Sequence, residues 1–376
     1  NGMVRPPSLN GLKWAMMNIF QHQVGERGRT MSKHTKKDQV KVLGIDIAKQ
    51  SFELHGHDES GRVVLKKKLS RNKLPAFVAN LPPCVIGMEA CGSANYWYRV
   101  FTEMGHTVHL MAPQFVKPFV KSNKNDAADA EAICEAVQRP SMRFVTPKSI
   151  EQQDIQGIHR IRSQAVKVQT MQINQIRGLL VEYGIVIPKG KKHVRKRLLE
   201  IIEDENNGLT QTFRGELREL YDELIHLGKR IDSLEKKLGV IGKQSEECQL
   251  LMTIPGVGIL TATALLAAIG NASMFKSGRE LAAWLGLVPR QFSTGGKQTL
   301  LGISKRGDKY LRTLLIHGAR SVVQMAGKHV DSRSQWIIRL VERRGRNISA
   351  VALANKNART AWAVLTKKRS YVLDPV

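Results

Sequence analysis

The sequence predicts an α/β domain, then long helices, then a helical C-terminal region. Three observations carry this prediction. Strand-like apolar runs alternate with short helical segments over about residues 40–148, a helical period follows over 149–247, and Gly-rich turns separate helices over 248–376. A chain of 376 residues is too long for one ordinary hydrophobic core. We therefore expect these regions to form separate domains, preceded by a flexible extension over residues 1–39.

The first domain is expected to hold a mixed sheet flanked by helices. The predicted strands are Val40 to Ile47, Ser51 to His57, Arg62 to Leu69, Cys84 to Ala90 and Thr107 to Pro113. Helices are predicted from about Asn72 and from Tyr96 to Met104. Three leading strands followed by alternating helices and strands are typical of a mixed sheet covered by helices.

The middle region is predicted to form a coiled coil or a helical hairpin. Its second half has apolar residues spaced by three and four, at Leu217, Leu220, Leu224, Leu227, Ile231, Leu234 and Leu238. The basic run "PKGKKHVRKR" lies between the helices and is expected to be a solvated loop. With so basic a chain, we expect Lys191, Lys192 and Arg195 of this loop to contact phosphate.

The segment "IPGVGILTATALLAAIG" opens the last region and has the form of a helix-hairpin-helix. In that motif, a Gly-rich turn presents backbone N–H groups to a phosphate, here through Gly256 and Gly258. The alternative is a glycine turn that only joins two packed helices.

The composition points to a polyanionic partner. Fifty-nine Lys and Arg against 32 Asp and Glu give a net charge of +27, which favours nucleic acid over most other partners. No uninterrupted apolar run is long enough for a membrane span. Four scattered cysteines favour neither a zinc site nor a disulfide scaffold, which fits a reducing cytoplasm.

Four acidic residues are candidates for a metal site. Asp126 and Asp129 stand one helical turn apart at a predicted helix start, where they could simply favour the helix dipole. Asp46 interrupts an apolar strand, however, and Glu89 ends another. A carboxylate in a buried strand is unfavourable unless a cation compensates it. If the first and fourth strands are neighbours, the four acids converge on a site suited to Mg²⁺ or Mn²⁺.

The motifs "GIDIAK", "IGMEACG" and "KNDAADA", with "GLVPRQFSTGGKQTLLGISKRGDKYLR" downstream, resemble the IS110 family of transposases, with the IS1111 branch as the best match. The resemblance implies an RNase H-like (RuvC-like) domain with the acids Asp46, Glu89, Asp126 and Asp129. It also implies a coiled-coil connection and a C-terminal transposase domain with a nucleophilic serine. Family members are DNA recombinases, and some are guided by a noncoding bridge RNA and act as dimers or tetramers.

The loop "FSTGGK" is where the resemblance places the nucleophile. We assign it to Ser293, with Thr294 as the alternative hydroxyl. The bases Lys297, Lys305, Arg306 and Arg312 surround this loop and are expected to contact phosphate.

The predicted function is therefore DNA cutting and rejoining through a phosphoserine link, with divalent metal, donor and target DNA, and bridge RNA, at the bacterial nucleoid. Two alternatives stay open at the level of sequence. One is a metal-dependent nuclease of the Holliday-junction type, without a covalent step. The other is a nucleic-acid-binding protein without catalysis, in which the acids are structural.

Overall fold

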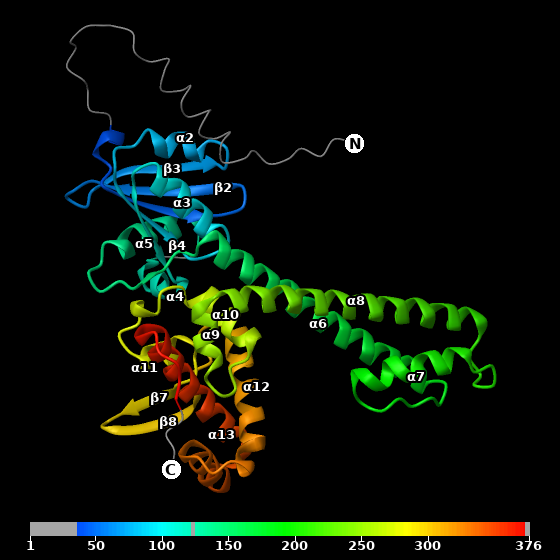
Figure 1. Cartoon of the computed structure of the whole chain (residues 1–376). Coiled ribbons are helices and arrows are strands. Elements are labelled where there is room, and N and C mark those ends of the chain that lie inside the picture. The colour runs from blue at the N-terminus through cyan, green and yellow to red at the C-terminus, as the bar shows by residue number, and fades with distance from the viewer. Residues whose placement is uncertain (1–35, 122–124, 373–376) are drawn as a thin grey trace, which may run out of the picture. The chain divides into compact units, whose positions relative to one another are not determined.

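The computed structural model describes residues 36–121 and 125–372 (Figure 1). The chain divides into two compact units, one ending at Val145 and the other beginning at Thr146. The expected flexible extension lies outside the described residues up to residue 35, and Lys36–Gln39 form a 3₁₀ helix, η1. The expected subdivision of the second unit near residue 248 stays a prediction.

The first unit is built on a six-stranded sheet in the order β3-β2-β1-β4-β5-β6. The strands are β1 Val42–Ile47, β2 Ser51–His57, β3 Val63–Ser70, β4 Val85–Glu89, β5 Thr107–Met111 and β6 Phe144–Val145. Strand β1 runs antiparallel to β2 and parallel to β4, so the predicted mixed sheet is confirmed. The two-residue strand β6 was not expected, because so short a segment has no readable period.

Helices cover both faces of this sheet. They are α2 Leu74–Ala79, α3 Ala94–Glu103, α4 Pro113–Val116, η2 Lys117–Phe119 and α5 Asp126–Val137. Leu43 and Ile45 of β1 belong to the core on the side of α2 and α3, where Trp97 packs edge-on against Phe52 at 5.3 Å between ring centroids. Since side chains alternate along a strand, Val42, Gly44 and Asp46 face the opposite side, which α5 covers.

Gly44 allows α5 to lie directly on β1. A Cβ atom at Gly44 would stand 2.4 Å from the Ala130 carbonyl oxygen and 2.5 Å from the Cys134 nitrogen, far inside van der Waals contact. Gly87 of β4 is similarly close to Val137, at 2.8 Å from its Cβ. Two glycines on adjacent strands therefore form the groove that receives the helix.

The second unit begins with a helical arm, made of α6 Ile150–Val181, α7 Lys191–Glu203 and α8 Gln211–Gln244, with α7 at its far end (Figure 1). The predicted apolar period is confirmed, since Leu217, Leu224 and Leu238 are fully buried. An ion pair between Arg162 of α6 and Glu235 of α8, with N to O distances of 2.6 and 2.8 Å, joins the two long helices.

The basic run at residues 188–197 differs from the prediction of a loop. From Lys191 onward it forms the first turns of α7. The reason is an apolar stripe hidden among the bases: Val194 and Leu198, four residues apart, are fully buried against the arm. Lys and Arg are good helix formers, so the charge does not oppose this helix.

The rest of the second unit is mostly helical, with one β-hairpin. Its elements are α9 Glu246–Met252, α10 Ile259–Ile269, η3 Ala272–Met274, α11 Gly278–Trp284, β7 Pro289–Thr294, β8 Lys297–Ile303, α12 Lys309–Met325, η4 Ala326–Lys328 and α13 Ser332–Lys367. Helix α13 is kinked at Gly345, which has a φ of 76°. Among the described residues, no helix is both long and apolar enough to cross a membrane.

The segment expected as a loop around Ser293 is instead the β7–β8 hairpin. Gly295 and Gly296 form its turn with φ angles of 55° and 74°, the pair of positive values that a tight two-residue hairpin turn requires. Every residue of β7 is exposed, and the same holds for β8 except at Ile303. The hairpin therefore projects from the unit without a core of its own.

We predict that Gly44→Ala destabilises the first unit. The added methyl group would force α5 away from β1, which should lower the free energy of unfolding by about 1–3 kcal/mol. Differential scanning calorimetry would measure this loss. The matched control is Gly92→Ala, because a Cβ there meets no atom within 4 Å. Equal stability of the two variants would contradict the steric role of Gly44.

Candidate metal centre and reactive hydroxyl

Three of the four predicted acids meet in the first unit. Asp46 comes from β1, and Asp126 and Asp129 come from the first turn of α5. One possible ligand atom from each residue lies within 4.8 Å of those of the other two. Asn125 fixes the start of α5 by accepting a hydrogen bond on its side-chain oxygen from the Ala128 nitrogen at 2.8 Å.

Glu89 borders this cluster without being part of it. It ends β4, the parallel neighbour of β1, one residue beyond the last registered pair of Ile45 with Met88. Burial raises the pKa of the Cys91 thiol, and the charges of Glu89 and Asp46 raise it further. Both carboxylates therefore act on the same neighbour, and Glu89 lies at the edge of the acidic site.

The electrostatics of the cluster favour a bound cation. Burial raises the pKa of Asp46 to about 6, with further contributions from the negative charges of Asp129 and Asp126. A divalent cation would offset this repulsion, and carboxylate oxygens are the ligands that hard divalent ions prefer. The ligand atoms that converge here are the carboxylate oxygens of Asp46, Asp126 and Asp129, so the donor set is made of oxygen. The residues fit a divalent metal.

The predicted nucleophile is exposed on the hairpin of the second unit. Ser293 of β7 is paired with Gln298 of β8, and its hydroxyl oxygen accepts a hydrogen bond from the Gln291 side-chain nitrogen at 2.9 Å. Thr294 is equally exposed and stands next to the turn, paired with Lys297. The structure thus presents both candidate hydroxyls to solvent.

The four bases predicted around the serine have different environments. Lys297, Lys305 and Arg306 are exposed and free to meet a phosphate. Arg312 differs from the prediction, because it is only 8% exposed and its Nη1 donates to the Leu285 carbonyl oxygen at 3.0 Å. Weaker bonds from the same nitrogen reach two carbonyls just before α12. Arg312 therefore holds the chain that follows the hairpin.

The basic residues of the arm line a shallow depression on α7. Lys191, Lys192, Arg195 and Lys196 surround a volume of about 530 Å³. Arg195 is half-buried, with its guanidinium lying against Gly228 of α8. Three of these bases were predicted to contact nucleic acid. Lys196 belongs to the same run and lines the same depression, although the sequence analysis did not name it.

The glycine turn before α10 combines packing with exposure. Gly256 has a φ of 89°, and a Cβ there would meet the Gly318 carbonyl oxygen of α12 at 2.9 Å. Gly256 thus serves close helix packing, as the simpler alternative expected. Gly258 is exposed at the N-cap of α10, where the free N–H groups of the first turn could meet a phosphate.

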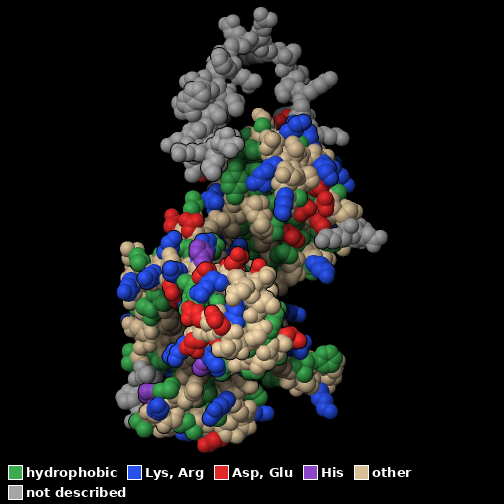
Figure 2. All heavy atoms as spheres, turned by 90° about the vertical axis from the view of Figure 1, so that its right-hand side faces the viewer, with side chains coloured by type: hydrophobic (Ala, Val, Ile, Leu, Met, Phe, Trp, Pro, Cys, Tyr) green, Lys and Arg blue, Asp and Glu red, His purple; other side chains and the backbone are tan. Residues whose placement is uncertain are grey.

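A further exposed basic cluster, which the sequence analysis did not single out, lies at the kink of α13. Arg343, Arg344 and Arg346 flank Gly345 and are all exposed. The run "ERRGR" was the available signal. On the face that Figure 2 shows, Lys and Arg side chains are spread over the surface and not confined to one patch. Contact with a polyanion therefore need not be limited to one element.

In a chain with a net charge of +27, a mixed sheet whose acidic site favours a cation indicates an enzyme that acts on nucleic acid. Comparison with known families makes this more specific. The IS110 DEDD family, described as "Transposase", matches residues 43–185, and the "Transposase IS116/IS110/IS902 family" matches residues 248–335. The first covers all four predicted acids and the second covers Ser293. The chain belongs to the IS110/IS116 family of transposases.

Individual relatives agree with this assignment. A "Probable family 20 transposase" of Pseudomonas aeruginosa is 50% identical over 330 residues, covering 88% of this chain and 98% of that protein. The "Transposase for insertion sequence element IS1111A" of Coxiella burnetii is 47% identical over 97% of this chain and 98% of its own length. The transposase of IS1328 from Yersinia enterocolitica is 43% identical, covering 87% and 97%. The protein is a DNA transposase of an insertion sequence.

We predict that Asp46→Asn stabilises the metal-free protein at pH 7 and removes its binding of a divalent metal. A carboxyl whose pKa is raised by folding opposes folding above that pKa, so the metal-free protein should gain stability as pH falls from about 7 through 6. The neutral amide should abolish this gain and raise the melting temperature at pH 7 by a few degrees. It should also remove the rise in melting temperature that Mn²⁺ produces in the parent.

The control for Asp46→Asn is Glu103→Gln, an exposed acid at the end of α3. It should keep both the pH profile and the response to Mn²⁺. Melting curves measured by circular dichroism, with and without the ion, test both variants. A full Mn²⁺ response in Asp46→Asn would remove this residue from the metal site.

Proposed function

We propose that this transposase cuts and rejoins DNA through a covalent phosphoserine link at Ser293. Asp46, Asp126 and Asp129 would hold the divalent ion, Mg²⁺ or Mn²⁺, with Glu89 completing the set at its edge. The meeting of the three carboxylates at the start of α5 is the observation that supports this proposal most strongly. The exposed hydroxyl within the second family match supports the covalent step.

The covalent step exchanges one ester for another. The Ser293 oxygen forms a bond to a DNA phosphorus while the bond from that phosphorus to one DNA oxygen breaks. The serine proton ends on the released DNA hydroxyl, so no water or ATP is consumed. A hydroxyl of a second DNA strand then displaces serine by the same reaction in reverse, and the free Ser293 returns.

The side chains around each site support this chemistry in different ways. When bound, a divalent ion stabilises negative charge on the transferring phosphoryl group. The carboxylates would hold it, and the burial and mutual repulsion that raise the pKa of Asp46 make a cation favourable there. Lys297, Lys305 and Arg306 would neutralise DNA phosphate near the hairpin, since all three are exposed.

We further propose that a noncoding bridge RNA guides the protein and that it works as a homo-oligomer, a dimer or tetramer, at the nucleoid. The net charge of +27 favours an extensive polyanionic partner, and the α7 depression gathers four bases suited to a phosphate backbone. RNA pairing would then select the donor and target DNA, and side chains would mainly contact the backbone.

The second candidate is a metal-dependent nuclease that directs water at DNA and forms no protein–DNA link. The acidic cluster alone would suffice for it. The exposed serine within the matched transposase region favours the covalent route. The two mechanisms differ in one observable product, a protein bound covalently to DNA.

We predict that Ser293→Ala abolishes the covalent adduct. Incubation with labelled donor DNA and Mn²⁺, followed by a denaturing gel, should show a slow band for the parent and at least a hundredfold less for the variant, as expected for a lost nucleophile. The matched control Thr294→Val, at the neighbouring exposed hydroxyl, should retain the band. The reverse pattern would move the role to Thr294, and a parent that cuts DNA without any adduct would favour the nuclease.

We predict that the purified protein carries a discrete RNA. Extraction and sequencing should yield one main species, and replacing Lys191, Lys192 and Lys196 together with Gln should reduce its amount several-fold, because each lost phosphate contact weakens binding. Lys229→Gln with Arg230→Gln and Lys243→Gln, exposed on α8, removes the same charge elsewhere. An RNA-free preparation that still recombines DNA would overturn RNA guidance.

A further inference from the structure

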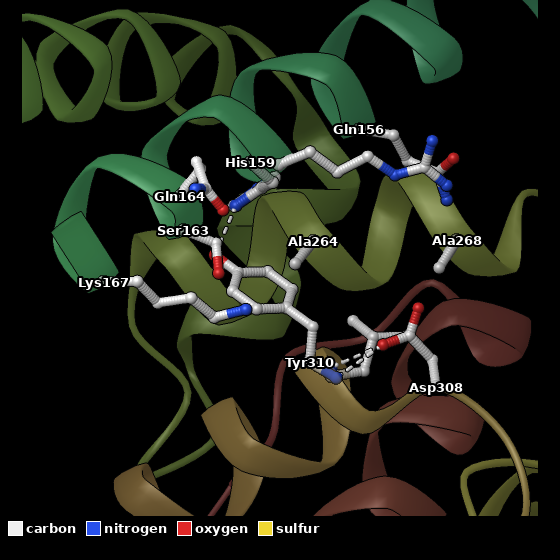
Figure 3. A pocket seen from close by; sticks show the side chains of 11 residues that line it. Gln156, His159, Ser163, Gln164, Lys167, Ala264, Ala268, Asp308 and Tyr310 are labelled. Carbon is white, nitrogen blue, oxygen red and sulfur yellow. Dashed lines mark hydrogen bonds between the residues drawn. The ribbon is translucent and has the colours of Figure 1, made fainter.

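A polar pocket lies between α6, α10 and the start of α12, within the second unit (Figure 3). Its volume is about 240 Å³. Ala264 and Ala268 of α10 line one side, and the ring of Tyr310 projects from α12 (Figure 3). Neither the acidic cluster nor the hairpin that carries Ser293 contributes to its lining. The pocket is thus a feature that the reaction described above does not use.

A buried histidine fixes the aromatic wall of this pocket. The Nδ1 atom of His159 lies 2.9 Å from the Tyr310 hydroxyl, and its Nε2 atom lies 3.0 Å from Oγ1 of Thr263. Burial, assisted by the charge of Arg162, lowers the pKa of His159 to about 4, so the imidazole is neutral at pH 7. Tyr310 is thereby held in place and offers a rigid ring to a ligand.

The rim of the pocket is basic. Arg160 and Lys167 are exposed on α6 and, seven residues apart, lie on the same side of that helix. Asp308 is the acid among the lining residues, and its carboxylate already accepts hydrogen bonds from the backbone nitrogens of Tyr310 at 2.7 Å and Leu311 at 3.0 Å. The open rim therefore favours an anionic ligand.

The remaining lining side chains suit a group that both donates and accepts hydrogen bonds. Gln156 and Gln164 carry amides and Ser163 a hydroxyl, all of them from α6 (Figure 3). Pockets for drug-sized ligands measure roughly 300–1,000 Å³, so this one has room for a smaller group. An aromatic wall, amide edges and a cationic rim together match one nucleobase with its phosphate.

We propose that this pocket receives one unpaired deoxynucleotide of the DNA during strand exchange. The base packs against Tyr310, its edge meets the amides and hydroxyl of α6, and Arg160 and Lys167 bind its phosphate. The proposal rests on the transposase activity of the family, and not on the identity of the nucleophile. Holding one nucleotide out of the helix would keep the two strands apart while ends are exchanged.

The test compares two DNA duplexes that differ in one group. Both carry a single bulged nucleotide, which in one duplex is normal and in the other lacks its base. The full-length protein should bind the normal bulge about tenfold more tightly, as expected when a stacked base is removed. Binding is measured by fluorescence anisotropy at fixed salt, so the result does not depend on DNA cutting.

Variants that fill the pocket link this preference to the site. Ser163→Leu, and independently Ala268→Leu from the opposite side, should bind both duplexes equally while retaining affinity for perfectly paired DNA. The matched control Thr170→Leu, exposed on α6 outside the pocket, should keep the tenfold preference. Equal binding of the two duplexes by the parent, or a preference that survives both filling variants, would overturn the proposal.

Removing the rim charges tests the phosphate contact and the source of the nucleotide. Arg160→Gln with Lys167→Gln should weaken binding of both bulged duplexes several-fold more than Lys236→Gln with Lys237→Gln on α8. A parallel series uses duplex RNA with the same bulge. A base preference seen with RNA and absent with DNA would overturn the assignment to DNA.

Discussion

The close approach of α5 to β1 is the contact on which the acidic site depends. Gly44 removes the side chain that would separate the helix from the strand, and the helix carbonyl of Ala130 occupies that space. Because Asp46 follows Gly44 by two residues, it faces the same helix. The first turn of α5 then brings Asp126 and Asp129 to within a few ångströms of it. Chain geometry, and not attraction between the acids, assembles the cluster.

This arrangement places like charges together against their repulsion. Loss of water around the buried carboxyl raises the pKa of Asp46, and the charges of Asp129 and Asp126 raise it further. The opposing stabilisation comes from apolar packing on both faces of the sheet, including the fully buried Ile45 next to Asp46. A fold held by its core can keep carboxylates in an unfavourable state that a cation relieves. Tyr310 likewise is held by buried groups, since its hydroxyl contacts the buried His159, while its ring lines an open pocket.

Much of the fold could be predicted because its local patterns agree with its final environment. The apolar strand runs form the sheet and the heptad-like leucines form the arm, and β1 and β4 are neighbours, which the sequence analysis stated only as a condition. That order brings Glu89 beside β1, whereas the meeting of Asp46 with the acids of α5 depends on the packing of α5 against Gly44. Prediction failed where the environment of a residue depends on distant parts of the chain. Arg312 is buried and donates a hydrogen bond to the carbonyl oxygen of Leu285, 27 residues earlier, and no local sequence pattern indicates such a partner.

Other differences between prediction and structure arose where one stretch of sequence supported two interpretations. The basic run of α7 looked like a loop because charge and the preceding Pro and Gly concealed the spacing of Val194 and Leu198. The hairpin looked like a loop because Ser, Thr and Gly dominate its composition. The glycine pair at 295 and 296, flanked by alternating residues, was nonetheless the usual indication of a tight hairpin turn.

The stability of the β7–β8 hairpin determines how well the hydroxyl of Ser293 is positioned. Phe292 is 64% exposed and Leu300 63% exposed, on a two-stranded ribbon that has no hydrophobic face buried beneath it. An isolated ribbon of this kind is only marginally stable in water. Any surface that covers these apolar side chains therefore also stiffens the strand that carries the serine. In the proposed mechanism, covering the hairpin and aligning the Ser293 hydroxyl are in this way thermodynamically linked.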